Sequence, residues 1–450
     1  MTFLLNTKGY FQKILRRGPL FERLLQELEE NEKLSYEQLI ALQNQKLRST
    51  ICHAYQTVPY YRQLFDELAI NPKAIQTSED LKALPIISKT DLRGKEKQFV
   101  SNAIFPKFKT ATSGTTGTPV SLFRDYYSIN LEHASIWRQK HWGKCMFDEL
   151  TVSIRGDVVV DPDIIKPPFW KYISSDNMLK MSSYHLSDRL LPYYLEKLRS
   201  LNSFIIEGYP SNLYRIARYM QLHQELPIKV KAVFTSCETL LPRQRQVIEE
   251  YFGQVFDHYG QSERVGHISM CEYGNYHYSI DYSLIEFIPI GQNDLHRVVG
   301  TTFHNKAMPF IRYDTGDFVR ISNPNKSCSC GRIFPVIESI EGRIEDYIIT
   351  PSGKWIGAMG RVLLNVNNII EAQIIQEKLD FIRVLIVTTE NFTVQDEKVL
   401  LNNIQQRIGS EIKIAIEKTD KIQRTKRGKL KITISLLKHE EINNCHSIFV

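Results

Sequence analysis

The amino-acid sequence predicts an α/β protein with a large N-terminal domain of mixed parallel sheets and helices and a small α+β domain after it. Between about residues 108 and 340, short β-rich runs alternate with helical stretches, an order typical of parallel or mixed sheets. After Gly342-Arg343 the pattern restarts with strand-like runs around one helix. A chain of 450 residues is also too long for one ordinary core. We therefore expect one domain at 1–342 and a second, mobile one at 343–450.

The first hundred residues predict a mainly helical lead-in, because leucines recur at helical spacing through 20–70 with a break at Val58-Pro59. The strand-like runs that follow are 151–154, 203–209, 232–236 and 254–260, and the helical stretches are 187–200, 211–225 and 242–252. In the small domain we expect a helix at 395–408 and strands at YIIT, FIRVLIVTT and IKIAIEK. Ligands bind beyond the carboxyl ends of parallel strands, so the polar loops there are candidate sites.

Composition excludes several classes of protein. A hydrophobic content of 42% with 24% charged residues is typical of a soluble globular protein, and no apolar run approaches the roughly 20 residues of a membrane span. The net charge of +7 is dispersed, and the basic run at 421–431 is too local for a nucleic-acid surface. Seven cysteines, an odd and scattered set, make no disulfide framework and fit a reducing cytoplasm.

The first 18 residues combine a short apolar patch with basic residues but lack the order of a signal peptide. Two roles stay open for an amphipathic helix there. It could pack onto its own domain, or it could make weak contact with a membrane surface.

Residues 110–119, TATSGTTGTP, concentrate hydroxyl side chains and glycines in one loop. Glycine lets the backbone approach an anion, while hydroxyl and N–H groups donate to phosphate oxygens. The lysine of the GxxxxGK[ST] phosphate loop is absent, so a cation must come from elsewhere in the chain. The alternative is a Ser/Thr/Gly-rich surface loop without a ligand.

Four further motifs follow in order: YGQSE at 259–263, YDTGD at 313–317, GRIED at 342–346 and RTKRGK at 424–429. Each is weak alone, but together with the hydroxyl-rich loop the set resembles the adenylate-forming superfamily. The phenylacetate–CoA ligase group is most similar, especially members associated with capsular polysaccharide clusters. The resemblance extends over essentially the whole chain through VPYYR (58–62), LPIISKTDLR (84–93), EGYPS (207–211), FTSCETLLP (234–242), DHYGQSE (257–263) and CSCGR (328–332).

The resemblance implies that the chain joins a carboxylic acid to AMP with release of pyrophosphate, and it assigns roles to individual residues. Glu263 would bind Mg²⁺, Asp317 the ribose hydroxyls of ATP, Arg343 the region of ribose and phosphate, and Lys429 the carboxylate and α-phosphate. The ATP phosphates would be held by Ser113, Gly114, Thr115, Thr116 and Gly117. The adenine would be framed by Ser236, Cys237, Glu238, His258, Tyr259 and Gly260.

The chemistry of such a reaction explains these residue types. A carboxylate and an α-phosphate are both anions, so Mg²⁺, a lysine and N–H donors must offset the charge that develops between them. Glu263 is the oxygen ligand that Mg²⁺ takes. Lys429, on a small mobile domain, could leave after the first step and let a second partner enter. The alternative for Lys429 is one solvated lysine among many.

The acid and the acyl acceptor are less readable. An aryl or other small organic acid is expected, and the acyl-pocket candidates are Trp137, His141, Trp142, Tyr209, Pro210 and Ser211, although such aromatics are often core residues. The family hinge commonly reads GR-x-Asp-Asp, whereas this chain has Gly342-Arg343-Ile344-Glu345-Asp346. The acceptor therefore stays open between coenzyme A, a carrier thiol and a sugar amine or hydroxyl. An alternative function is a nucleotide-binding accessory or regulatory protein of glycan assembly, and a homodimer is also left open.

Cys271, His277, Cys328 and Cys330 are the candidate ligands of a structural Zn²⁺ ion in a Cys₃His site. Such a site would join the loop after YGQSE to the loop before GRIFP. The alternative is three free thiols and a loop histidine that is satisfied by other partners.

Overall fold

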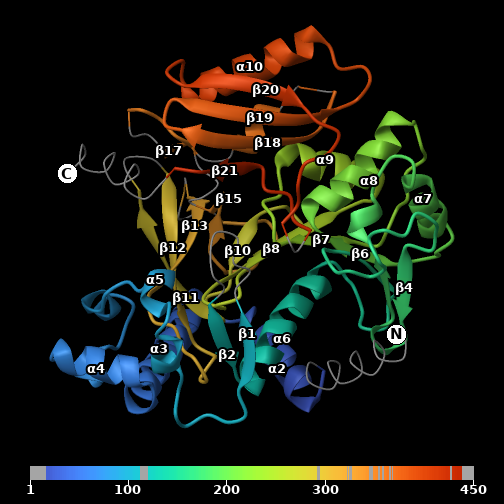
Figure 1. The fold of residues 1–450 in the computed structure, drawn as a ribbon. Coiled ribbons are helices and arrows are strands. Elements are labelled where there is room, and N and C mark those ends of the chain that lie inside the picture. Colours follow the sequence, from blue (N-terminus) through green and yellow to red (C-terminus); the bar gives the residue numbers. More distant parts are fainter. Residues whose placement is uncertain are drawn as a thin grey trace.

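The structure is a computed structural model that describes residues 17–111, 120–290, 294–321, 323, 327–343, 348–352, 355–356, 359–363, 366, 368–425 and 428–437. It confirms the predicted fold class: a large α/β domain carries a small domain with its own sheet, drawn at the top of Figure 1. The α-helices among these residues are α2 (Pro19–Asn31), α3 (Tyr36–Thr57), α4 (Pro59–Glu67), α5 (Lys89–Leu92), α6 (Tyr126–Trp142), α7 (Leu191–Arg199), α8 (Pro210–Leu222), α9 (Pro242–Tyr251) and α10 (Val394–Ile408).

A nine-stranded mixed sheet forms the centre of the large domain, in the order β14-β10-β9-β8-β7-β6-β3-β5-β4. Strands β5, β3, β6, β7 and β8 are parallel, so the carboxyl ends of all five meet at one edge. The strands are β3 (Thr151–Ile154), β4 (Trp170–Ile173), β5 (Met178–Met181), β6 (Ile205–Gly208), β7 (Val233–Ser236), β8 (Val255–Gly260), β9 (His267–Met270), β10 (Tyr276–Tyr278) and β14 (Val336–Ile337).

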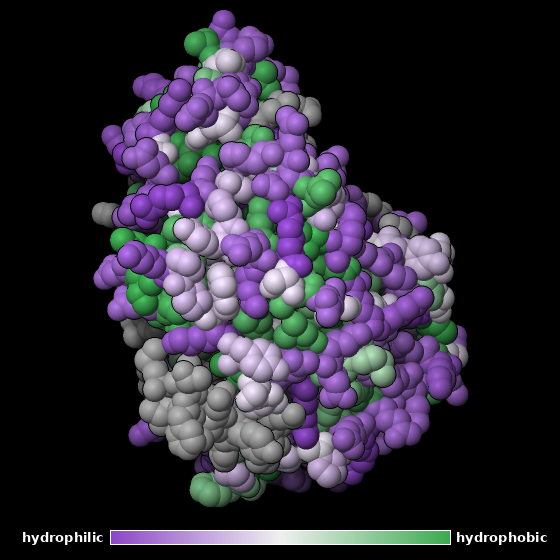
Figure 2. Space-filling model, turned by 90° about the vertical axis from the view of Figure 1, so that its right-hand side faces the viewer, coloured by the Kyte–Doolittle hydropathy of each residue, from purple (hydrophilic) through white to green (hydrophobic). Residues whose placement is uncertain are grey.

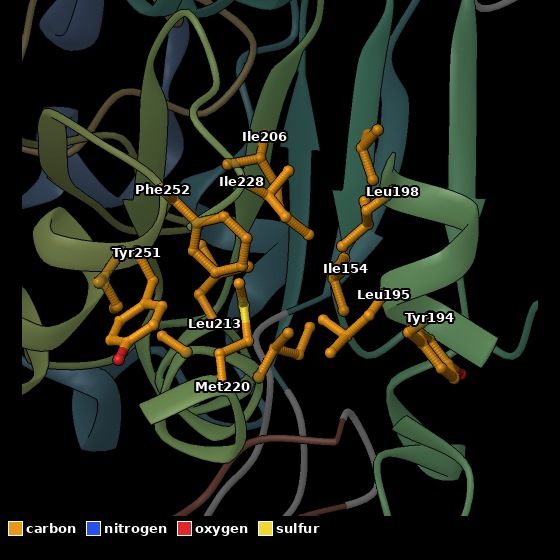
Figure 3. Close-up of a cluster of buried hydrophobic side chains, with 14 of the residues drawn as sticks. Ile154, Tyr194, Leu195, Leu198, Ile206, Leu213, Met220, Ile228, Tyr251 and Phe252 are labelled. Carbon is orange, nitrogen blue, oxygen red and sulfur yellow. The ribbon is translucent and has the colours of Figure 1, made fainter. Parts of the chain in front are cut away.

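Four of the five parallel strands, β3, β6, β7 and β8, lie within the runs that the sequence predicts, whereas β5 lies in none of them. Strands β3, β6 and β7 are buried at every position. Such continuous burial is expected of parallel strands covered on both faces. Figure 3 shows Ile154 and Ile206 on one face of the sheet, packed with side chains of α7, α8 and α9. On the other face, Ile205, Phe234 and Phe256 pack with Trp142 at the end of α6.

A second sheet brings the YDTGD and GRIED motifs together. Its order is β11-β12-β13-β15, all antiparallel, and Asp317 on β13 lies opposite Arg343 on β15. A separate hairpin of β1 and β2 places Ala111 opposite Ser121, at the two ends of the hydroxyl-rich loop. These strands are β1 (Phe108–Ala111), β2 (Ser121–Arg124), β11 (Ser283–Pro289), β12 (Leu295–Thr302), β13 (Tyr313–Arg320) and β15 (Ser339–Arg343).

The helical lead-in covers α6 and the base of the second sheet. Leu24 and Leu28 of α2 are fully buried in a cluster with Leu131, Ala134 and Trp137 of α6. Helix α3 begins at a capping box formed by Ser35 and Gln38, which satisfies free N–H groups of its first turn.

The small domain packs α10 on a four-stranded sheet in the order β20-β19-β18-β21. Strands β18 and β19 are antiparallel, and each gains a parallel neighbour at the edge, β21 and β20 respectively. A two-stranded β16–β17 sheet precedes them. The strands are β16 (Ile348–Ile349), β17 (Trp355–Ile356), β18 (Ile369–Lys378), β19 (Phe381–Thr388), β20 (Lys413–Lys418) and β21 (Thr433–Ser435).

The two domains meet through cationic side chains that bind main-chain carbonyls. Arg243 of α9 donates from Nη1 to the carbonyl oxygens of Leu363 and Val366, at 3.0 and 2.6 Å. In the opposite direction, Lys429 Nζ of the small domain donates to the carbonyl oxygen of Cys237 at 3.0 Å. Figure 2 shows the narrower small domain above the larger one, on a face that is mainly hydrophilic with scattered hydrophobic side chains.

Within the described part of the chain, none of the helices combines the length and apolar character needed to cross a bilayer. The N-terminal residues 1–16, for which an amphipathic helix is predicted, lie outside the described residues.

Candidate active site

A cavity of about 320 Å³ lies where the carboxyl ends of β7 and β8 meet the second sheet and the small domain. This is the edge at which open α/β sheets bind ligands. The residues that line it come from all three parts and include Cys237, Glu238, His258, Tyr259, Gly260, Glu263, Asp317, Arg343 and Lys429. The structure thus brings together residues from four separate motifs.

Asp317 is held between a tyrosine and an arginine. Tyr259 Oη donates to Asp317 Oδ2 at 2.6 Å, and Arg343 Nε donates to Oδ1 at 3.1 Å. Antiparallel pairing of β13 with β15 places Asp317 and Arg343 side by side, so the strand register itself builds the pair. Burial, followed by the charge of Asp317, raises the pKa of Tyr259, which therefore stays a hydrogen-bond donor at neutral pH.

Glu263 follows the end of β8 and accepts a hydrogen bond from Tyr313 Oη at 3.1 Å. Burial raises the pKa of this carboxyl, while the charge of Arg343 acts in the opposite direction. A partly desolvated carboxylate that faces a cavity gains from a bound cation. Glu263 therefore fits the predicted role of Mg²⁺ ligand.

The turn at 236–238 receives the small domain. Glu238 accepts hydrogen bonds from the N–H groups of Ser211 and Leu430, at 3.1 and 2.9 Å, and so joins the two domains with one carboxylate. Cys237 has a φ of +72°, a left-handed conformation that is uncommon for a residue with a side chain. Its carbonyl oxygen accepts the hydrogen bond from Lys429 Nζ.

Lys429 is presented by a tight turn. Gly428 N donates to the carbonyl oxygen of Thr425 at 2.8 Å, and Thr425 Oγ1 accepts from Lys429 N at 3.1 Å. Gly428 has a φ of +72°, and a Cβ atom there would lie 2.9 Å from Gly156 Cα of the large domain. The lysine is therefore presented by a backbone that only glycine fits, because the conformation is left-handed and space is lacking.

His258 faces the cavity from β8, opposite Ser236 of β7. Burial lowers the pKa of His258 to about 3, so the ring is neutral at physiological pH. A neutral ring suits a wall for a planar base better than a charged one. Ser113, Gly114, Thr115, Thr116 and Gly117, the predicted phosphate loop, lie outside the described residues.

Comparison with known proteins adds to this geometry. Residues 348–436 match a family model described as the CapK C-terminal domain. The chain is 26% identical over 417 residues to Protein CapK of Staphylococcus aureus, covering 89% of this chain and 90% of that protein. It is 25% identical over 346 residues to a phenylacetate-coenzyme A ligase of Thermus thermophilus, covering 71% and 74%. A crystal structure of 2-hydroxyisobutyryl-CoA ligase in the postadenylation state, in complex with 2-HIB-AMP, has a TM-score of 0.65 at 17% identity, over 90% of this chain and 91% of that one.

The chain has the fold of the adenylate-forming CoA ligases. Its relatives are CapK and the phenylacetate–CoA ligases, which confirms the resemblance that the motifs indicate.

Three acyl-pocket candidates lie elsewhere in this adenylate-forming fold. Trp137 is buried against α2, His141 Nδ1 contacts Glu29 Oε1 at 2.5 Å, and Trp142 Nε1 donates to Glu32 Oε1 at 2.8 Å. None of the three lines the cavity: α2 covers the face of α6 that carries Trp137, and Trp142 packs on the central sheet.

The other three candidates lie near the domain junction. The ring of Tyr209 lies 5.8 Å from Lys429 Nζ, and Ser211 lines the cavity and accepts from Arg424 of the small domain at 3.0 Å. Pro210 begins α8 and is buried. These positions link the EGYPS motif to the docking of the small domain.

A buried group of charges in the large domain was not predicted from the sequence. Lys140 of α6 donates to Glu207 of β6 at 3.2 Å, and Arg155 at the end of β3 lies 3.6 Å from the same carboxylate. Glu207 belongs to EGYPS, so the motif carried a signal, but its partners lie 52 and 67 positions earlier, as the residue numbers show. Arg124 was also missed; its Nη2 donates to the carbonyl oxygen of Ser262 at 2.9 Å and ties β2 to the loop of Glu263.

The predicted metal ligands Cys271, His277, Cys328 and Cys330 gather in one place, away from the cavity lining. They join the loop after β9 and strand β10 to the segment before β14.

Proposed function

We propose that this chain activates a small carboxylic acid with ATP to form an acyl-AMP and pyrophosphate, and then transfers the acyl group to an acceptor thiol. One observation carries the proposal: Lys429 of the small domain reaches the same cavity as Glu263 and the Asp317–Arg343 pair of the large domain. A cation on a separate domain supplies the charge that the hydroxyl-rich loop lacks.

In this mechanism a carboxylate oxygen of the acid attacks the α-phosphorus of ATP, and the bond between that phosphorus and pyrophosphate breaks. Lys429 offsets the charge that develops between the two anions. Glu263 would hold Mg²⁺, which supplies positive charge opposite the phosphate oxygens. Asp317 already accepts two hydrogen bonds, and an ionised carboxylate has about four lone-pair positions, so it retains capacity for ribose hydroxyls.

For the second step we propose coenzyme A as the acceptor, supported by relatives named phenylacetate-coenzyme A ligase. A second candidate acceptor is a carrier or sugar in surface polysaccharide biosynthesis, which rests on the resemblance of the sequence motifs to members associated with capsular polysaccharide clusters. An aryl acid gains no support from Trp137, His141 and Trp142, since none of the three lines the cavity. Homodimer formation stays a prediction.

Pyrophosphate release from ATP over a panel of aryl, hydroxy and short aliphatic acids tests the first step. We expect release with one class of acid, and we expect Lys429→Ala to abolish it. Lys421→Ala is the matched control, because Lys421 lies exposed on the same segment and its main-chain carbonyl, not its side chain, accepts a hydrogen bond from Thr419 Oγ1. Nucleotide binding without pyrophosphate release on any acid would contradict the proposal and favour the accessory or regulatory function.

Mass spectrometry of the products then tests the acceptor. A coenzyme A thioester of the active acid is the expected product. An acyl-AMP that accumulates in the presence of coenzyme A would instead direct the search to carrier and sugar acceptors.

A further inference from the structure

Three thiols and one imidazole form a compact group at the edge of the nine-stranded sheet. The ligand atoms of Cys271, His277, Cys328 and Cys330 all lie within 4.8 Å of one another. The Sγ atoms of Cys271 and Cys328 are 3.6 Å apart, and Cys330 Sγ is 3.3 Å from His277 Nε2. In a tetrahedral zinc site, Zn–S and Zn–N bonds place two sulfurs about 3.7 Å apart and a sulfur and a nitrogen about 3.5 Å apart. The two observed spacings are close to these values.

The histidine is oriented as a metal ligand. His277 Nδ1 lies 2.7 Å from the carbonyl oxygen of Phe334, which can only accept, so Nδ1 carries the proton. The lone pair of Nε2 is therefore free and points toward Cys330 Sγ. Zinc-bound histidines commonly have their other ring nitrogen fixed in this way.

Polar neighbours also suit thiolates. Asn275 Nδ2 donates to Cys328 Sγ at 3.2 Å. Arg332 makes a side-chain hydrogen bond to Cys330, and it is held by Glu272 at 2.7 Å and against the ring of Trp142 at 4.2 Å. Three thiolates and Zn²⁺ together carry one negative charge, which this arginine offsets.

We propose that Cys271, His277, Cys328 and Cys330 bind one structural Zn²⁺ ion. Four protein ligands complete a tetrahedral shell, and none of them lines the active-site cavity, so the ion has no open position for catalysis. The site joins the end of β9 and strand β10 to the segment that leads through β14 into β15. Cys328 precedes Arg343 by fifteen positions, so the site fixes the path of the chain that leads to Arg343.

Metal analysis of the native chain, purified without chelator, tests the proposal independently of any acid or nucleotide. We expect one zinc per chain by elemental mass spectrometry, and Co²⁺ substitution should give the sulfur-to-cobalt charge-transfer band of thiolate ligation. The double variant Cys328→Ser/Cys330→Ser should lose the metal, whereas Cys52→Ser on α3 should keep it.

Three results would overturn the proposal: native chain without bound metal, iron in place of zinc, or a Cys271–Cys328 disulfide found by thiol titration. Since the native chain is measured directly, a variant that fails to fold does not decide the question. A chain that binds zinc but activates no acid would contradict the proposed function and would not contradict the proposed zinc site.

Discussion

Tyr259 and Asp317 share a hydrogen bond of 2.6 Å, although they lie on different sheets, 58 positions apart in sequence. The bond joins the end of a parallel strand of the central sheet to the middle of an antiparallel one. It fixes the carboxylate that we assign to the ribose, at the place where the two sheets form one wall of the cavity.

Asp317→Asn should raise the KM for ATP. A hydrogen bond to a charged group contributes about 1.5–3 kcal/mol, so the expected increase is roughly 10- to 150-fold. Tyr259→Phe leaves the carboxylate in place and removes only its orientation, so a smaller increase is expected from pyrophosphate-release kinetics. Equal increases in the KM for ATP would contradict the idea that Asp317 binds the nucleotide and Tyr259 only orients Asp317.

Gly428→Ala should impair pyrophosphate release while nucleotide binding persists, because the added Cβ would meet Gly156 Cα at 2.9 Å and displace Lys429. Gly409→Ala is the matched control: this glycine also has a positive φ, +86°, but an added Cβ has nothing within 4 Å. If both variants lose activity equally, backbone strain and not domain docking is responsible.

Glu207→Gln should destabilise the fold by several kcal/mol, because it leaves Lys140 buried without an ionised partner. Urea unfolding followed by circular dichroism measures the change. Glu225→Gln is the control, since it breaks a more exposed pair with Arg199 and should cost at most about 1 kcal/mol. If Glu207→Gln lowers the free energy of unfolding as little as Glu225→Gln does, the buried pair makes no net contribution to stability.

Stability should fall as the pH drops below about 6.5. Burial lowers the pKa of His304 to about 3 and that of His267 to about 4, so each ring is neutral in the folded chain but gains a proton on unfolding. Their contribution is complete above the unfolded pKa and is lost with falling pH, by about 1.4 kcal/mol per pH unit for each ring. The measurement is the urea midpoint between pH 5 and 7.5.

His304→Leu should reduce the dependence of the free energy of unfolding on pH by the contribution of one ring. Neither nitrogen of His304 has a hydrogen-bond partner among the described residues, so the substitution breaks no such bond. His223→Gln, a change at an exposed ring, should leave the slope as it is. An unchanged slope in His304→Leu would show that this ring is protonated in the folded chain.

The sequence was informative where a local pattern decides the structure. Runs of buried β-branched and aromatic residues locate β3, β6, β7 and β8, and motif order places Glu263, Asp317 and Lys429 at one cavity. It was uninformative where a distant partner decides. Trp142 looks like a pocket residue until Glu32, 110 positions away, is seen to bind it. The sequence around Cys237 likewise gives no signal of its positive φ or of the hydrogen bond that its carbonyl oxygen accepts from Lys429, 192 positions away.

Two of the cations that span the domain junction, Arg243 and Lys429, bind carbonyl groups of the peptide backbone, whereas Arg424 donates to the Ser211 hydroxyl. Every amino acid has a main-chain carbonyl group, so substitutions at residues 237, 363 and 366 can keep these hydrogen bonds between the domains. Single neutral acceptors also hold an arginine or a lysine less tightly than a carboxylate would. Weak contacts of this kind suit the mechanism that we propose, in which Lys429 leaves with the small domain after the first step.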